Sequence, residues 1–185
     1  MKRVCVFCGS QVGVRSLYQQ AAVALGQLLV ARGYGLVYGG GHVGLMGVIA
    51  DAVLAQGGEV IGVIPESMVA RELAHTGVTS LQVVSGMHER KARMAAQAEA
   101  FIALPGGYGT FEELFEVITW AQLRLHSKPI GILNVGGYFD ATRAMLEQAM
   151  HEGFIRAEYR HLVTIAETPV ALMDALGLSS GQETS

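Results

Sequence analysis

The chain has 185 residues, of which 51% are hydrophobic and 16% are charged, and its formal net charge is −3. This composition is typical of a folded globular domain and excludes a disordered chain. The weakly acidic balance provides no basic field for nucleic acid, and no apolar run reaches the roughly 18 residues of a membrane helix. We therefore expect one cytoplasmic domain over residues 1–176, with residues 177–185 as a small, polar, disordered tail.

Short apolar runs alternate with longer helical patterns along the chain. Alternating strands and helices are typical of a parallel sheet with helices on both faces. The central runs are continuously apolar, as expected of strands that are buried on both faces. We therefore predict a single-domain α/β fold, a Rossmann-like doubly wound parallel sheet. The expected strands are 3–8, 36–38, 60–64, 81–84, 100–104, 130–133 and 161–165, and the expected helices are 16–31, 45–56, 87–98, 111–125, 139–151 and 169–176.

Cys5 and Cys8 have the C-x-x-C spacing of a redox pair. Redox pairs lie at helix starts, where the helix dipole lowers the thiol pKa. These two cysteines lie in an apolar run that reads as a strand, on which residues three apart point to opposite faces. We interpret them as buried structural thiols.

A first glycine-rich loop, GGGHVGLMG, follows the second predicted strand and opens a helix. Gly39, Gly41 and Gly44 satisfy the G-x-G-x-x-G pattern of dinucleotide sites, and Glu66 lies near the end of the next strand, where such sites carry an acidic residue. The match falls on the second strand rather than on the first. Glycines that permit close helix–strand packing are the alternative interpretation.

A second glycine-rich loop, PGGYGTFEE, follows the fifth predicted strand. Gly106, Gly107 and Gly109 allow sharp turns, and their amides, with those of Thr110 and Phe111, would face outward at a helix start. Such amides and the helix dipole favour an anion, so a phosphate is the expected ligand.

Local structure explains part of the same loop without any ligand. Thr110 and Glu113 have the T-x-x-E spacing of a capping box, in which each side chain bonds the other residue's backbone amide. Acidic residues in a first turn also suit the helix dipole. The loop alone does not decide whether Glu113 is structural or catalytic.

Three cations crowd the start of the predicted helix at 87–98, where they oppose the dipole. Arg90, Lys91 and Arg93 are offset only in part by Glu89. They form either a solvated face or one side of a site for an anionic ligand, beside the second glycine loop. Arginine suits such a ligand because its planar fork can hold a phosphate or a purine edge.

Together, PGGYGTFEE, MHERKARMA and GGGHVGLMG closely resemble the LONELY GUY family of cytokinin-activating enzymes. The resemblance covers residues 4–176 and includes the complete P-G-G-x-G-T-x-x-E signature. It implies hydrolysis of cytokinin riboside 5'-monophosphates to free base and ribose 5-phosphate, without metal or cofactor. It also implies a homodimer with the site near the subunit interface.

The resemblance implies a role for each matching residue. Glu113 corresponds to the catalytic glutamate and Arg90 to the catalytic arginine. A carboxylate near the anomeric carbon can stabilise oxocarbenium charge and activate water, while an arginine can stabilise the leaving base. The expected substrate-binding residues are Glu72, Lys91, Gly106, Gly107, Tyr108, Gly109, Thr110, Phe111, Glu112 and Thr119. No metal-ligand spacing connects the six histidines.

Two other functions fit the same residues. The first is a general nucleoside-monophosphate nucleosidase that acts on AMP, because the sequence does not reveal the preferred base. The second is a non-catalytic binder of a nucleotide or pterin-type cofactor, since molybdenum-cofactor carriers share a similar fold and glycine loops. Lysine decarboxylation, a label often given to such relatives, has little support because one domain of this size leaves little room for pyridoxal-phosphate chemistry.

Overall fold

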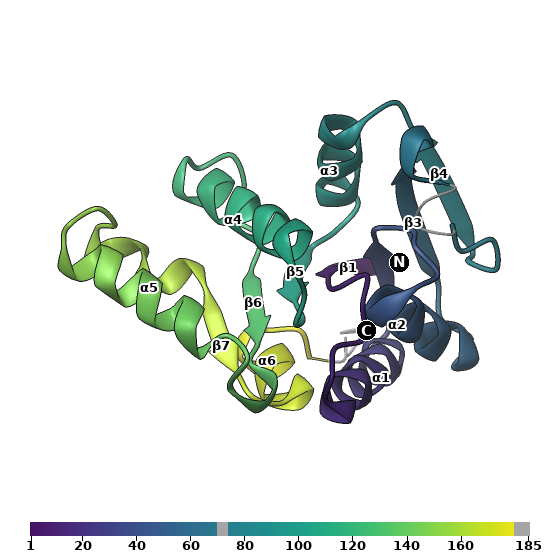
Figure 1. Cartoon of the computed structure of the whole chain (residues 1–185), viewed down its shortest axis with the longest axis horizontal. Helices are drawn as coiled ribbons and strands as arrows, with labels where there is room; N and C mark the ends of the chain where they lie inside the picture. The colour runs from purple at the N-terminus through teal and green to yellow at the C-terminus, as the bar shows by residue number, and fades with distance from the viewer. Residues whose placement is uncertain (70–73, 180–185) are drawn as a thin grey trace, which may run out of the picture.

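The computed structural model describes residues 1–69 and 74–179, and within these ranges seven strands form one sheet. The strand order is β4-β3-β2-β1-β5-β6-β7, and all neighbouring strands are parallel (Figure 1). The strands are β1 Lys2–Phe7, β2 Tyr34–Tyr38, β3 Val60–Pro65, β4 Ser80–Val84, β5 Ala100–Ala103, β6 Ile130–Leu133 and β7 Thr164–Ala166. The helices are α1 Ser16–Ala31, α2 Gly44–Ala55, α3 Met87–Ala96, α4 Tyr108–Gln122, α5 Asp140–His151 and α6 Pro169–Ala175, with 3-10 turns η1 Glu66–Met68, η2 Val135–Gly137 and η3 Ala157–Leu162.

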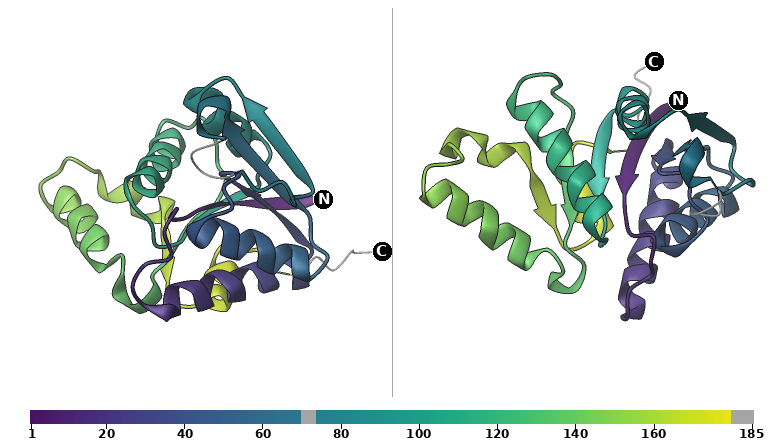
Figure 2. Two further views of the ribbon diagram at one scale, coloured as in Figure 1. Left: turned by 45° about the vertical axis from the view of Figure 1, so that its right-hand side comes forward. Right: turned by 45° about the horizontal axis from the view of Figure 1, so that its top comes forward.

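Helices cover both faces of the sheet, which confirms the doubly wound α/β prediction. One hydrophobic cluster joins α1, α2 and α6 to one face, and a second joins α3 and α4 to the other. Figure 1 shows these two layers on opposite sides of the strands, and Figure 2 shows α5 at the edge of the molecule beside β7. Among the described residues, the helices are too short or too polar to cross a membrane.

The sheet reverses its winding direction between β1 and β5. The chain builds outward from β1 to β4, then crosses to the other side of β1 and builds outward again from β5. The loops that follow these two strands therefore lie side by side, and the Gly9 amide donates to the Pro105 carbonyl at 3.0 Å. Ligands of doubly wound sheets bind at this kind of switch point, beyond the carboxyl ends of the strands.

Most predicted boundaries lie within two residues of the observed ones, and the exceptions have local causes. Helix α4 begins at Tyr108 rather than Phe111, because Gly107 takes the N-cap position. It ends at Gln122 rather than at Leu125, and Arg124 beyond it has a φ of +61°, which a right-handed helix does not contain. The last strand begins at Thr164 because the preceding residues form η3. The predicted tail also begins too early: Leu178 is buried in the core, and its carbonyl accepts from Arg32 Nη1 at 3.0 Å. Residues 180–185 lie outside the described part of the chain.

The loop before α2 contains a glycine that the fold requires. Gly44 has φ +66°, and a β-carbon there would lie 2.2 Å from the backbone of Ser10. Gly33 has φ +78° but no heavy atom within 4 Å of the same point. We predict that Gly33→Ala costs about 1 kcal/mol of unfolding free energy from conformation alone. Gly44→Ala adds a steric overlap and costs about 3 kcal/mol.

Urea unfolding of the two variants measures this difference. Equal losses at the two positions would show that the approach of Gly44 to Ser10 is not what constrains the loop.

Candidate active site

A cavity of about 210 Å³ lies at the carboxyl ends of β1 and β2 and at the start of α4. We call it the strand-end cavity. Its polar lining comes from Ser10 after β1, Arg90 on α3, and Thr110, Glu112 and Glu113 on α4. The cavity thus lies at the switch point of the sheet, where the topology predicts a ligand.

The first turn of α4 forms one wall of this cavity. Gly107, Tyr108, Gly109 and Thr110 all line it, and no side chain caps the helix. The first amides of a helix have no intrahelical acceptor, so this wall is suited to an anion. The predicted contribution of the Phe111 amide is wrong, because that amide donates to the Gly107 carbonyl at 3.1 Å.

Gly106 has a packing role beside this turn. A β-carbon at position 106 would lie 2.0 Å from Thr110 Oγ1 and 2.8 Å from the Gly9 nitrogen. Gly107 and Gly109, by contrast, face open space. The absence of a side chain at Gly106 therefore lets the loops after β1 and β5 meet, while Gly107 and Gly109 keep the approach to the amides clear.

The capping-box interpretation of Thr110 and Glu113 is wrong. Because α4 begins at Tyr108, Thr110 is its third residue and Glu113 its sixth, and neither occupies the cap. Both residues are buried: Thr110 is 3% exposed and Glu113 is 8% exposed. Glu113 therefore lies one turn inside the helix, on the face that turns toward the cavity and Arg90.

Backbone carbonyl groups hold Arg90 in place. Its Nε donates to the Val63 carbonyl at 3.1 Å, and its Nη2 donates to the Gly39 carbonyl at 3.0 Å. The residue is only 5% exposed, so its charge is held in a largely dry position. A β-carbon at Gly39 would lie 2.1 Å from Nη2, so this glycine makes room for the guanidinium.

Arg90 and Glu113 form the charged centre of the cavity. Arg90 Nη1 lies 3.9 Å from Glu113 Oε1. A buried charge is tolerated only when an opposite charge and hydrogen bonds surround it. Arg90 has both, from the Glu113 carboxylate and from the two backbone carbonyl groups. A fixed carboxylate and a fixed cation, side by side, can stabilise charges of opposite sign that develop on two parts of one substrate.

Only one of the three clustered cations reaches the cavity. Arg93 pairs on the surface with Glu89 at 2.6 Å. Lys91 contacts the carboxylates of Glu112 and Glu116, the latter at 3.0 Å, and does not line the cavity. Lys91 therefore ties α3 to α4, and Glu112 lines the cavity while it pairs with Lys91.

The other predicted binding residues have different positions. Tyr108 is 95% exposed at the rim of the cavity. Phe111 packs edge-on against Phe139, with ring centroids 6.1 Å apart. Thr119 is exposed and donates to the Phe115 carbonyl at 2.7 Å, outside the cavity formed by the described residues of this chain. Glu72 lies outside the described residues.

Several residues of the site were not predicted, among them Met46, Met68 and Met87 in the cavity lining. Ser10 lines the cavity, and the Tyr138 hydroxyl donates to the Gly106 carbonyl beneath the first turn of α4. The signal for Ser10 was its position directly after the first strand. Its importance depends on β1 lying beside β5, which the pattern of apolar runs does not specify.

The first glycine loop packs against the protein itself. The amides of Leu45 and Met46, at the start of α2, both donate to the Gly9 carbonyl, at 2.9 and 3.4 Å. A dinucleotide site would use these amides for its pyrophosphate. The structure therefore favours the packing interpretation of this loop and gives Gly39 a specific role in admitting Arg90.

The two cysteines lie on opposite faces of the sheet, as predicted, and both are reduced and buried. Cys8 follows the end of β1 and lines the cavity. Burial raises the pKa of both thiols well above the ordinary value, and the negative charge of Glu113 raises them further. Neither thiol has the low pKa of a redox cysteine.

The fold and the cavity define a doubly wound α/β protein with a helix start that no side chain caps, beside a buried arginine–glutamate pair. The family model described as "Possible lysine decarboxylase" matches residues 46–176. In Oryza sativa subsp. japonica, the "Probable cytokinin riboside 5'-monophosphate phosphoribohydrolase LOGL2" is 54% identical over 95% of this chain and 72% of its own length. In Arabidopsis thaliana, the "Cytokinin riboside 5'-monophosphate phosphoribohydrolase LOG3" is 51% identical over 95% of this chain and 81% of its own.

Solved structures share the fold at lower identity. A molybdenum-cofactor carrier protein of Chlamydomonas reinhardtii has a TM-score of 0.70 at 19% identity, over 96% of each chain. A molybdenum cofactor binding protein of Rippkaea orientalis has a TM-score of 0.67 at 22% identity, over 92% of each chain. The identity to the plant proteins, over nearly the whole chain, shows that this protein belongs to the LONELY GUY, or LOG, family of phosphoribohydrolases.

The thiols provide a test of the cavity in its resting state. Because folding raises the thiol pKa values, the reactive thiolate forms readily only after unfolding. The folded protein therefore contains less thiolate than the unfolded chain up to strongly alkaline pH. We predict that a disulfide reagent at pH 8 labels neither Cys5 nor Cys8 in native protein within the time that labels both in urea. Rapid labelling of the native protein would contradict the burial of this pair.

Proposed function

We propose that this protein hydrolyses the N-glycosidic bond of cytokinin riboside 5'-monophosphates and releases the free base and ribose 5-phosphate. The observation that carries the proposal is the Arg90–Glu113 pair, held 3.9 Å apart beside the first turn of α4. Relatives that are more than 50% identical over the aligned residues bear the names of enzymes of this reaction.

The start of α4 binds the 5'-phosphate in this proposal. The amides of Tyr108, Gly109 and Thr110 lie at the start of α4, which is the positive end of the helix dipole. The hydroxyl groups of Thr110 and Ser10 add hydrogen-bond donors. The phosphate fixes one end of the substrate, so the ribose extends toward Glu113, one turn further along the helix. Binding energy from this remote group is then used to orient the reacting bond.

Glu113 and Arg90 act on the two sides of the bond that breaks. As the C1'–N9 bond breaks, its electron pair moves to the base and positive charge develops on the ribose. The Glu113 carboxylate stabilises that charge and accepts a proton from the water whose oxygen bonds to C1'. Arg90 donates hydrogen bonds to the departing base without giving up its proton, and the base gains its proton from solvent.

The rest of the cavity suits a base with an apolar substituent. Met46 on α2, Met68 on η1 and Met87 on α3 all line it. Methionine side chains adapt to irregular apolar groups, so these residues support an isopentenyl-bearing adenine as the preferred base. AMP presents the same phosphate, ribose and adenine, so we propose it as a second and slower substrate.

The role of Glu113 is tested by Glu113→Gln. We predict that this variant still folds but loses about 10³-fold in kcat, because the amide keeps the volume but neither the charge nor the basicity. Its unfolding free energy falls by about 3 kcal/mol, because Arg90 loses its buried opposite charge. Free base released from isopentenyladenosine 5'-monophosphate, followed by chromatography, gives the rate. Glu116→Gln, one turn further along α4 and outside the cavity, is the matched control and retains activity.

We also propose that the protein is a homodimer in which the exposed turn after α4 contacts the partner. The apolar side chains along α4 are buried to different degrees: Leu114 is fully buried, and Phe111, Phe115 and Ile118 are half-buried. In the turn that follows the helix, Leu123 is 61% exposed and Leu125 is 69% exposed. Large apolar side chains left in solvent at one helix end are typical of an interaction surface. This surface directly follows the helix whose first turns line the cavity, which supports a site on the side of the molecule that faces the partner.

Leu125→Glu tests the dimer. We predict that the variant elutes with half the mass of the parent protein in size-exclusion chromatography with light scattering, because burying a carboxylate in an apolar interface is costly. Val170→Glu, at an exposed position on α6, is the control and leaves the mass unchanged. A parent protein with the mass of one chain would contradict the dimer.

A further inference from the structure

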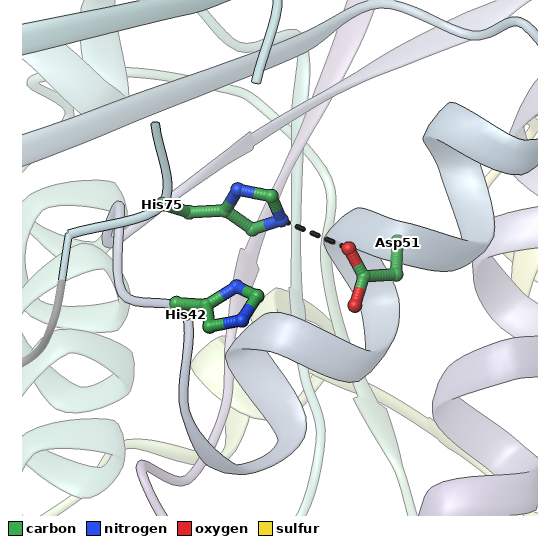
Figure 3. A group of neighbouring side chains, drawn as sticks. All are labelled: His42, Asp51 and His75. Atoms are coloured by element: carbon green, nitrogen blue, oxygen red, sulfur yellow. Dashed lines mark hydrogen bonds and ion pairs between the residues drawn. The ribbon is translucent and has the colours of Figure 1, made fainter. Parts of the chain in front are cut away.

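A group of three potential ligands lies apart from the strand-end cavity. His42 lies in the loop between β2 and α2, Asp51 on α2, and His75 after η1. One ligand atom from each lies within 4.8 Å of the other two, and Figure 3 shows the two imidazole rings and the carboxylate turned toward one another. The three residues lie outside the lining of the strand-end cavity that the described residues form.

The backbone fixes this arrangement independently of the three side chains. The His75 amide donates to the Gly40 carbonyl at 2.9 Å, and an isolated antiparallel bridge joins Gly41 to Ala74. Backbone hydrogen bonds thus join the two segments that carry the histidines, at His75 itself and at the residues directly before His42 and His75. The rings of His42 and His75 meet edge to face with centroids 4.6 Å apart. The group is therefore preformed, which lowers the conformational cost of adding a ligand between its members.

We propose that His42, Asp51 and His75 form a binding site for a divalent transition-metal ion, with Zn²⁺ as the best match. Two imidazoles and one carboxylate are a donor set that suits Zn²⁺, and three protein ligands leave a fourth position for water. Two ligand atoms bound tetrahedrally to one Zn²⁺ lie roughly 3.3 Å apart. His75 Nε2 and Asp51 Oδ1 are already 2.9 Å apart, so a small outward shift admits the ion between them.

The hydrogen bonds of the His75 ring change when the ion binds. The Gly77 amide donates to His75 Nδ1 at 3.2 Å, so the neutral ring carries its hydrogen on Nε2 and donates it to Asp51. Coordination through Nε2 moves this hydrogen to Nδ1. Both hydrogen bonds of the ring are then lost: the one to Asp51 gives way to the bonds of both residues to the ion, and the longer one from Gly77 breaks. His42 and Asp51 are both exposed, so they can reorient toward the ion with little disturbance of the core.

The bound ion would connect two segments that shape the active site. His42 follows Gly39, whose carbonyl holds Arg90, and His75 follows η1, which carries Met68. The proposed site does not depend on the reaction proposed above. A ligand that binds only the folded state raises its stability, so the ion is expected to raise the melting temperature.

Titration of the chelator-treated full chain with Zn²⁺ in a calorimeter tests the site, with Co²⁺ absorption as a readout of ligand geometry. We expect one Zn²⁺ per chain and a higher melting temperature. His42→Ala and Asp51→Asn weaken binding at least tenfold. Both positions are exposed, so neither change threatens the fold, and Asp51→Asn keeps an acceptor for the His75 ring. His151→Ala, an exposed histidine on α5, leaves binding unchanged.

Two results would overturn the proposal. One is no saturable uptake of Zn²⁺ by folded protein, which would leave His75 and Asp51 as a hydrogen-bonded pair that only anchors the loop. The other is equal uptake by the parent protein and by both ligand variants, which would place the ion elsewhere on the chain.

Discussion

The site depends on the placement of one buried cation. The Arg90 guanidinium lies in a largely dry position and is tolerated there because carbonyl groups of Gly39 and Val63 and the Glu113 carboxylate surround it. Several features of the sequence follow from this single requirement. Glycine at position 39 leaves room for the guanidinium, and the early start of α4 places Glu113 one turn inside the helix. The ligand then enters a cavity in which both charges are already fixed.

Two glycine loops of similar appearance perform different tasks for that cavity. In the loop after β2, the helix amides bond the Gly9 carbonyl and Gly39 provides space for Arg90, so the loop supports the site from behind. In the loop after β5, Gly107 and Gly109 face open space and leave the start of α4 accessible. The neighbours of each loop, rather than its glycine spacing, determine whether its amides bind a ligand or the chain itself.

The sequence predicted the fold class and most element boundaries, because apolar runs and helical patterns report burial directly. It misplaced the start of α4 because the T-x-x-E pattern favours a cap at Thr110, whereas the observed cap is Gly107. It grouped Lys91 with Arg90, whereas residues adjacent on a helix point about 100° apart, so Arg90 lines the cavity and Lys91 pairs with Glu112 and Glu116 beside it. The contacts of Ser10 and the gathering of His42 with His75 depend on strand order and loop packing, which local patterns do not encode.

The central claim is that the start of α4 binds a 5'-phosphate and thereby orients the glycosidic bond against Glu113. The most direct test compares base release from isopentenyladenosine 5'-monophosphate with release from the same riboside without its phosphate, in one preparation of folded protein. We predict that the monophosphate releases free base and that the riboside is hydrolysed at least about 10²-fold more slowly, because only the phosphate can use the amides of α4. Equal rates on the two compounds, or no release from either, would contradict this account of the cavity.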